Sequence, residues 1–146
     1  EFGFAGQLTD DLNLSFGYTQ FSLKDLKNGG DARTFNPTQS LNLLTTYQVP
    51  QLPQLKLGLG VQWQDKTHLD IAESSANGVV TQKAGAIQQD AYALVNLMAS
   101  YELNDHITLQ ANGNNITNEK YLFNFPDGQG FYGAPANYSV AVKLKY

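Results

Sequence analysis

Apolar and polar residues alternate along seven separate segments of this chain, and that alternation restricts the fold more than any other feature. In the last segment Tyr138, Val140, Val142, Leu144 and Tyr146 share one face, and the residues between them are serine, alanine and lysine. Successive side chains of a β-strand point to opposite faces, so the pattern predicts strands with one apolar and one polar face. The other predicted strands comprise residues 2–8, 12–19, 41–47, 55–64, 92–101 and 107–112, with Leu44 interrupting the alternation of the third.

The connections between these segments are alternately short and long. Short turns fall at residues 9–11, 50–54 and 104–106, and long polar segments at 25–38, 67–88 and 118–136. Tight turns on one side and long loops on the other are typical of an outer-membrane β-barrel. A soluble sandwich also alternates, but only 15% of these residues are charged, against roughly 25% in an average soluble domain. We therefore predict an all-β fold, a transmembrane antiparallel β-barrel.

Tyrosine and tryptophan occur where the apolar faces would meet the two membrane surfaces. Such rings favour the headgroup level, because one edge is apolar and the other is hydrated. The opposite faces are rich in Asn, Gln, Ser, Thr and Gly, as expected of a water-filled lumen. The predicted girdle residues are Tyr18, Tyr47, Trp63, Tyr101, Tyr138 and Tyr146.

Composition excludes several other classes. A net charge of −4, with nine scattered Lys and Arg residues, does not fit binding to a nucleic-acid backbone. The chain has no cysteine, which excludes disulfide, zinc–thiolate and cysteine-nucleophile sites. No segment reaches the ~18–20 apolar residues of a membrane helix, and the first residues do not resemble a signal peptide.

Seven strands alone would not make a finished membrane protein. Bacterial single-chain barrels have even strand numbers, and an open sheet in lipid leaves two edges of unpaired backbone groups. Each such group costs several kcal/mol, so a whole edge outweighs the ~5–15 kcal/mol stability of a domain. We therefore expect at least one strand before Glu1, and further strands, from this polypeptide or another, that close the barrel.

A set of motifs in the second half of the chain resembles a known family. The motifs are Val95–Tyr101, Leu109–Asn112, Asn115–Tyr121 and Phe131–Pro135, followed by a terminal strand with an aromatic last residue. Together they resemble the C-terminal end of TonB-dependent siderophore receptors, near the ferric coprogen, ferrioxamine and ferric pyoverdine receptors. Two positions depart from the family pattern. Ala136 stands where arginine is usual, and Asn118 ends a motif that usually ends in aspartate.

The resemblance implies that residues 1–146 are the C-terminal part of a barrel of about 22 strands whose lumen holds an N-terminal plug domain. Such a receptor lies in the bacterial outer membrane, among lipid and lipopolysaccharide, and is built by the barrel assembly machinery. It would bind a ferric siderophore outside the cell and import it with energy from the TonB–ExbB–ExbD complex. No cofactor of its own is implied, since iron enters with the siderophore. No nucleic acid is expected as a partner.

Candidate ligand contacts are of two kinds. Gln64, Lys66 and Tyr92 have the parity of lumen residues near the extracellular strand ends, whereas Trp63 has the parity of a lipid-facing residue. The last long loop is rich in aromatic side chains that could line the mouth of the barrel. For each single residue, packing of the loop against its neighbours is the favoured alternative. The loop candidates are Phe123, Phe125, Phe131 and Tyr132.

The terminal pattern of Tyr138, Val140, Val142, Leu144 and Tyr146 also resembles the signal read by the barrel assembly machinery, although a lipid-facing strand would show it too. His68 and His106 are predicted at different ends of the barrel, with no second ligand at metal spacing, so we expect no metal site.

No Ser/His/Asp arrangement is predicted on facing strands, which disfavours an outer-membrane hydrolase. We expect a non-enzymatic receptor, with a passive or substrate-specific porin as the alternative.

Overall fold

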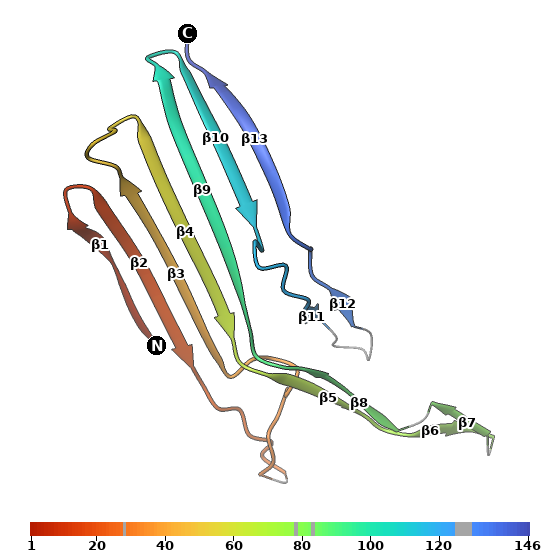
Figure 1. Cartoon of the computed structure of the whole chain (residues 1–146). Helices are drawn as coiled ribbons and strands as arrows, with labels where there is room; N and C mark the ends of the chain where they lie inside the picture. Colours follow the sequence, from red (N-terminus) through yellow and green to blue (C-terminus); the bar gives the residue numbers. More distant parts are fainter. Residues whose placement is uncertain (28, 78, 83, 125–129) are drawn as a thin grey trace.

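Seven antiparallel strands form a single sheet in the order β1-β2-β3-β4-β9-β10-β13. The computed structural model describes residues 1–146 except 28, 78, 83 and 125–129. Figure 1 shows the strands side by side as one curved sheet, and the seven predicted strands are all confirmed. They are β1 (Phe2–Thr9), β2 (Leu12–Gln20), β3 (Gln39–Gln48), β4 (Leu55–Gln64), β9 (Tyr92–Asn104), β10 (Ile107–Asn114) and β13 (Asn137–Leu144).

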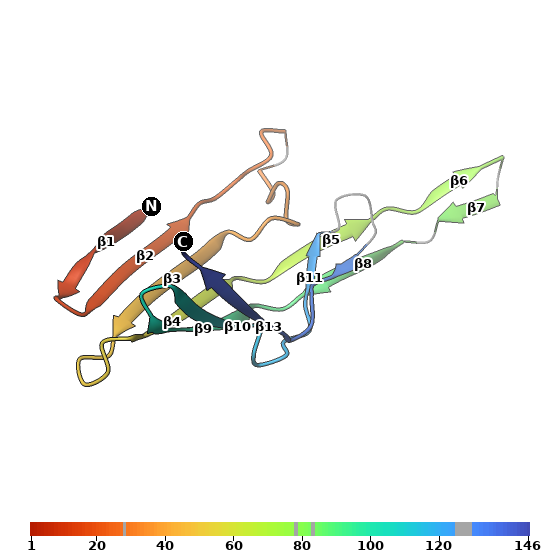
Figure 2. The same cartoon turned by 90° about the horizontal axis from the view of Figure 1, so that it is seen from above.

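Two of the three long connections contain short hairpins that the sequence analysis treated as loops. β5 (Thr67–Ile71) pairs with β8 (Gly85–Gln89), β6 (Ser74–Ala76) with β7 (Val79–Gln82), and β11 (Leu122–Asn124) with β12 (Phe131–Tyr132). The alternation of Leu69 and Ile71 with polar residues extends the pattern of β4 past the sheet, so the chain keeps pairing with itself. Figure 2 shows β5–β8 and β6–β7 extending away from the sheet as an arm.

The strand register places the alternating residues in continuous rows across the sheet. One row on the apolar face runs Phe4–Phe16–Leu43–Val61–Val95. The next residues along each strand form rows on the opposite face, which we call the polar face. One of these runs Asn13–Thr46–Gly58–Met98–Asn112. Trp63 pairs with Leu41 and Ala93, so it lies on the apolar face, as its parity predicts.

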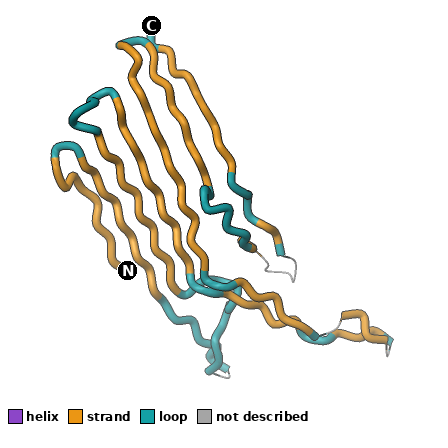
Figure 3. The backbone as a smooth tube through the Cα atoms, in the orientation of Figure 1, coloured by secondary structure: helices purple, strands orange, loops and turns teal. Residues whose placement is uncertain are grey.

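The short turns lie at one end of the sheet and the long connections at the other (Figures 1 and 3). The N-terminus lies at the loop end and the C-terminus at the turn end, as an odd number of antiparallel strands requires (Figure 1). The strand ends also step along the sheet. β9 begins at Tyr92, but its pairing with β10 begins only at Leu97, which lies opposite Gly113 near the end of β10. Residues 92–96 of β9 therefore extend beyond the end of β10. Such a stagger is the shear that tilted strands need in a barrel.

The sheet has almost no interior of its own. Among the described residues Tyr92 is the one buried apolar side chain, and Thr67 and Asn115 are the buried polar ones. Large apolar side chains remain exposed along the apolar face, among them Phe4, Leu57, Leu97 and Val142. An uncovered apolar surface of this extent marks contact with lipid or with another protein. No helix among the described residues is long and apolar enough to cross a membrane.

A charge on the apolar face should be far more costly than a charge on the polar face. Val61 and Gln62 are neighbours in β4 and face opposite sides. If the apolar face meets lipid, Val61→Arg should destabilise the intact protein by up to about 2–4 kcal/mol, because the guanidinium would enter hydrocarbon. Gln62→Arg should change stability little. Equilibrium urea unfolding in lipid vesicles measures both, and equal losses would contradict a lipid-facing assignment.

Candidate functional site

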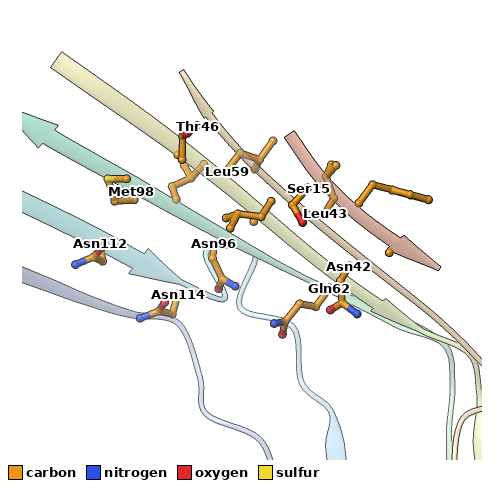
Figure 4. Close-up of a pocket in the computed structure, with 16 residues that line it drawn as sticks. Ser15, Asn42, Leu43, Thr46, Leu59, Gln62, Asn96, Met98, Asn112 and Asn114 are labelled. Carbon is orange, nitrogen blue, oxygen red and sulfur yellow. The ribbon is translucent and has the colours of Figure 1, made fainter. Parts of the chain in front are cut away.

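Amide side chains line a hollow on the polar face. Asn42, Gln62 and Asn96 extend to the same side of β3, β4 and β9 (Figure 4). The hollow has a volume of about 440 Å³. Gly58 and Gly60 form part of its floor, where a Cβ on Gly58 would lie 3.1 Å from the Met98 side chain. The surface therefore offers both donors and acceptors, with small residues between them.

Two of the predicted lumen residues are brought together by the register. Gln64 pairs with Tyr92 at the loop end of β4 and β9, and both line a second hollow of about 280 Å³. Lys66 lies elsewhere. It lines separate hollows with His68, on the segment between the sheet and the β5–β8 hairpin.

The aromatic candidates of the last long loop have different environments. Phe131 and Tyr132 form β12, and their side chains are 53% and 77% exposed. Phe123 belongs to β11, and only its backbone is described. Phe125 lies outside the described residues. Figure 1 shows β11 and β12 beyond the loop ends of β10 and β13, so the aromatic pair of β12 lies at the loop end of the molecule.

Tyr92 is held by a residue that sequence reasoning did not single out. The ring of Tyr121 stacks on the ring of Tyr92, with centroids 4.6 Å apart and an interplanar angle of 29°. Tyr92 is only 8% exposed. Tyr121 was visible in the sequence only as the last residue of the Asn115–Tyr121 motif, because its partner Tyr92 lies far away in the sequence, on β9.

Asn115 was likewise missed, and it ties the base of the last loop together. Its side-chain nitrogen donates to the carbonyl oxygens of Glu119 (2.9 Å) and Ala134 (3.0 Å), and its side-chain oxygen accepts from the Glu119 amide (2.8 Å). Its own amide donates to the Asn96 side-chain oxygen (2.9 Å). Asn115 has a φ of 48° and is 4% exposed. Asparagine tolerates this left-handed backbone better than most residues.

The first long loop folds back on itself through a charged pair. The Lys24 ammonium lies 2.6 Å from a carboxylate oxygen of Asp31. The hydrogen bond and charge of Lys24 hold the pKa of Asp31 below its ordinary value. Both side chains are exposed, so this pair joins the two sides of the loop without contributing much stability.

The histidines lie far apart along the sheet. His68 is in β5 at the loop end, and His106 is in the turn between β9 and β10, where its Nδ1 lies 3.1 Å from the Lys145 carbonyl oxygen. Among the described residues, no group of three or more His, Asp or Glu side chains could hold a metal ion.

The five residues of the predicted assembly signal end the chain on an exposed edge. Tyr138, Val140, Val142 and Leu144 lie on the apolar face of β13, and Tyr146 follows the strand. All eight residues of β13 are exposed, as are all eight of β1 at the other edge.

Comparison with known proteins gives one consistent family. The model of the TonB-dependent receptor-like β-barrel matches residues 1–116. The chain is 28% identical to the ferric-pyoverdine 358 receptor of Pseudomonas putida over 97% of its own length and 16% of that protein. It is 32% identical to the probable TonB-dependent siderophore receptor PiuA of Acinetobacter baumannii, over 84% of the chain and 17% of that protein. The chain thus spans only about a sixth of the curated relatives it matches.

A solved structure agrees with these sequence matches. The ferripyoverdine receptor of the outer membrane of Pseudomonas aeruginosa, bound to ferripyoverdine, superposes with a TM-score of 0.86 at 26% identity. The match covers 97% of this chain and 18% of that one. The fold of nearly the whole chain is therefore shared with part of that receptor.

Removing the side chain of Asn115 should loosen the last loop. Asn115→Ala removes the part-buried hydrogen bonds to the backbone of Glu119 and Ala134, which costs about 1–3 kcal/mol. Limited proteolysis of the intact protein should then cleave within residues 117–136 several-fold faster, because cleavage follows the population of the open loop. Thr117→Ala, an exposed neighbour, is the control. Equal cleavage of both variants and the wild type would show that the network does not hold the loop.

Proposed function

Because the chain belongs to the TonB-dependent receptor family, as a segment of its β-barrel, we propose that it is part of an outer-membrane receptor that imports a ferric siderophore. The match to the ferripyoverdine receptor over 97% of the chain is the observation that carries the proposal. Members of this family are β-barrels of the outer membrane, and they are receptors and transporters. Iron is cargo here, carried by ligands that the siderophore itself supplies.

The rest of the proposed receptor follows from the two exposed edges. Residues 1–146 are the C-terminal part of the barrel, and further strands pair with β1 and β13 to close a sheet of about 22 strands. Closure satisfies the backbone groups that lipid would otherwise leave unpaired. The polar face then surrounds the lumen and a plug domain. The TonB–ExbB–ExbD complex supplies the energy for import.

The apolar face is the surface for lipid and lipopolysaccharide. Tyr138, Val140, Val142, Leu144 and Tyr146 serve a second purpose in this proposal, as the signal for the barrel assembly machinery. An exposed terminal strand with alternating apolar residues suits recognition by strand pairing.

Ligand contact is assigned to the loop end. Phe131 and Tyr132 are exposed there, and aromatic faces suit a chelate of modest polarity. Phe123 and Phe125, in the same loop, belong to this aromatic set. Gln64 and Lys66 offer polar groups at the same end of the sheet. Tyr92 contributes as the support of Tyr121 more than as a contact, because it is buried beneath that ring.

Energy dependence separates this proposal from a passive porin. Cells that produce the intact protein should accumulate radioactive iron from ferripyoverdine or ferric enterobactin, the two probes. A proton ionophore should abolish uptake, because TonB draws on the inner-membrane proton gradient. Cells lacking the protein are the control. Uptake that persists with the ionophore indicates a porin, and failure of both probes to enter or bind contradicts the proposed ligand class.

Tyr132 should contribute to affinity. An aromatic contact contributes about 0.5–1.5 kcal/mol beyond its buried area, so Tyr132→Ala should weaken binding of the accepted probe about 2- to 12-fold. Tyr47→Ala removes the same side chain from the apolar face at the turn end and should leave affinity unchanged. Equilibrium titration of the purified protein measures both. Identical affinities for the wild type and Tyr132→Ala would remove Tyr132 from the site.

A further inference from the structure

The last long loop contains a glycine, Gly133, at which the structure leaves no room for a side chain. A Cβ atom added to Gly133 would lie 1.9 Å from Cζ of Tyr121 and 2.3 Å from both Cε atoms. These are distances that no relaxation of a few tenths of an ångström can relieve. The ring of Tyr121 therefore occupies the space in which any other residue at 133 would carry its side chain.

The same ring also contacts the sheet. Tyr121 stacks on Tyr92, the first residue of β9. The Gly133 amide donates to the Tyr121 carbonyl oxygen at 2.9 Å. The Leu122 amide donates to the Gln89 side-chain oxygen at 2.7 Å. The outgoing arm of the loop at 121–122 is thereby joined to Gln89, the last residue of β8, and to Tyr92, the first residue of β9, and the returning arm at Gly133 is bonded to the outgoing arm.

The exposed aromatic pair is the immediate continuation of this attachment. Tyr132 precedes Gly133 directly, and Leu122 pairs with Tyr132 across β11 and β12. The position of the pair is therefore set by the contacts that link Tyr92, Tyr121 and Gly133, which we call the aromatic clamp. A surface held in place before the ligand arrives loses less freedom on binding.

We infer that Tyr121 is a positioning residue for ligand recognition, acting through Gly133 on Phe131 and Tyr132. The inference rests on the proposed function. It assigns to Tyr121 and Gly133 a role in affinity that requires no contact of either residue with the ligand. It also gives the reason for glycine at 133, which is the space that the Tyr121 ring fills.

Substitutions that add a methyl group at 133 or remove the ring at 121 test the clamp directly. Gly133→Ala should displace the Tyr121 ring, whereas in a Tyr121→Ala background the added methyl meets no ring and should have no further effect. Tyr121→Phe keeps the ring and should behave as the wild type. In the ligand-free intact protein, amide hydrogen exchange at residues 122 and 133 should speed up in Gly133→Ala and Tyr121→Ala. Exchange at residues 93–99 of β9 should not change.

Loss of the aromatic clamp should lower the affinity for the siderophore probe. Gly133→Ala and Tyr121→Ala should each weaken binding of the accepted probe, ferripyoverdine or ferric enterobactin, on the order of tenfold, and the double variant no more than either one. Unchanged exchange in Gly133→Ala overturns the clamp, and altered exchange with unchanged affinity overturns the positioning role. Either result leaves the proposed function standing. A wild type that binds neither probe overturns that function, and this inference with it.

Discussion

Backbone hydrogen bonding in a medium without water determines everything else in this molecule. An unpaired N–H or C=O in hydrocarbon costs several kcal/mol, so each strand must pair along its whole length. The seven strands do this for one another except along the outer edges of β1 and β13 and where strand ends are staggered, as at residues 92–96 of β9 on the side of β10. Once the ladder register is set, the side-chain faces follow, because a slip of one residue would turn a whole strand's apolar set toward the polar face. Rows such as Phe4–Phe16–Leu43–Val61–Val95 are the result.

The seven strands of the sheet were predictable from the sequence. Strands that pair side by side place alternate residues on opposite faces, so a sheet with one apolar face leaves an alternating pattern in the sequence. Leu44 illustrates how far this goes. It interrupts the alternation of its segment, yet it pairs with Ser15 and Gly60 in perfect register. It is therefore an apolar side chain on the polar face, 57% exposed, and not a bulge. With Met98 it borders the glycine floor of the central hollow, which explains why a leucine fits there without crowding.

The loop end was less predictable because its contacts join residues far apart in the sequence. Nothing local relates Tyr92 to Tyr121, or Tyr121 to Gly133. The two departures from the family pattern show the same effect. Asn118 and Ala136 are 18 positions apart, and the Asn118 side-chain oxygen accepts from the Ala136 amide at 3.0 Å. The donor at 136 is the backbone amide, so the bond does not depend on the side chain there. At 118, asparagine offers a side-chain oxygen as aspartate does, and it tolerates the φ of 53°. Both replacements thus keep the bond.

The strands and the loop end place different demands on the sequence. Many residue types are compatible with a given strand position, because the lipid-facing side requires only an apolar side chain and the lumen side only one that water can hydrate. At the loop end the requirement is positional. A siderophore surrounds its iron with its own ligands, so a receptor of the proposed kind reads the outer surface of the chelate, where aromatic and amide groups must stand at fixed places. Fixing them takes buried, fully bonded groups such as Asn115 and space-filling contacts such as Tyr121 on Gly133. Substitutions that preserve the barrel can therefore still change what it binds.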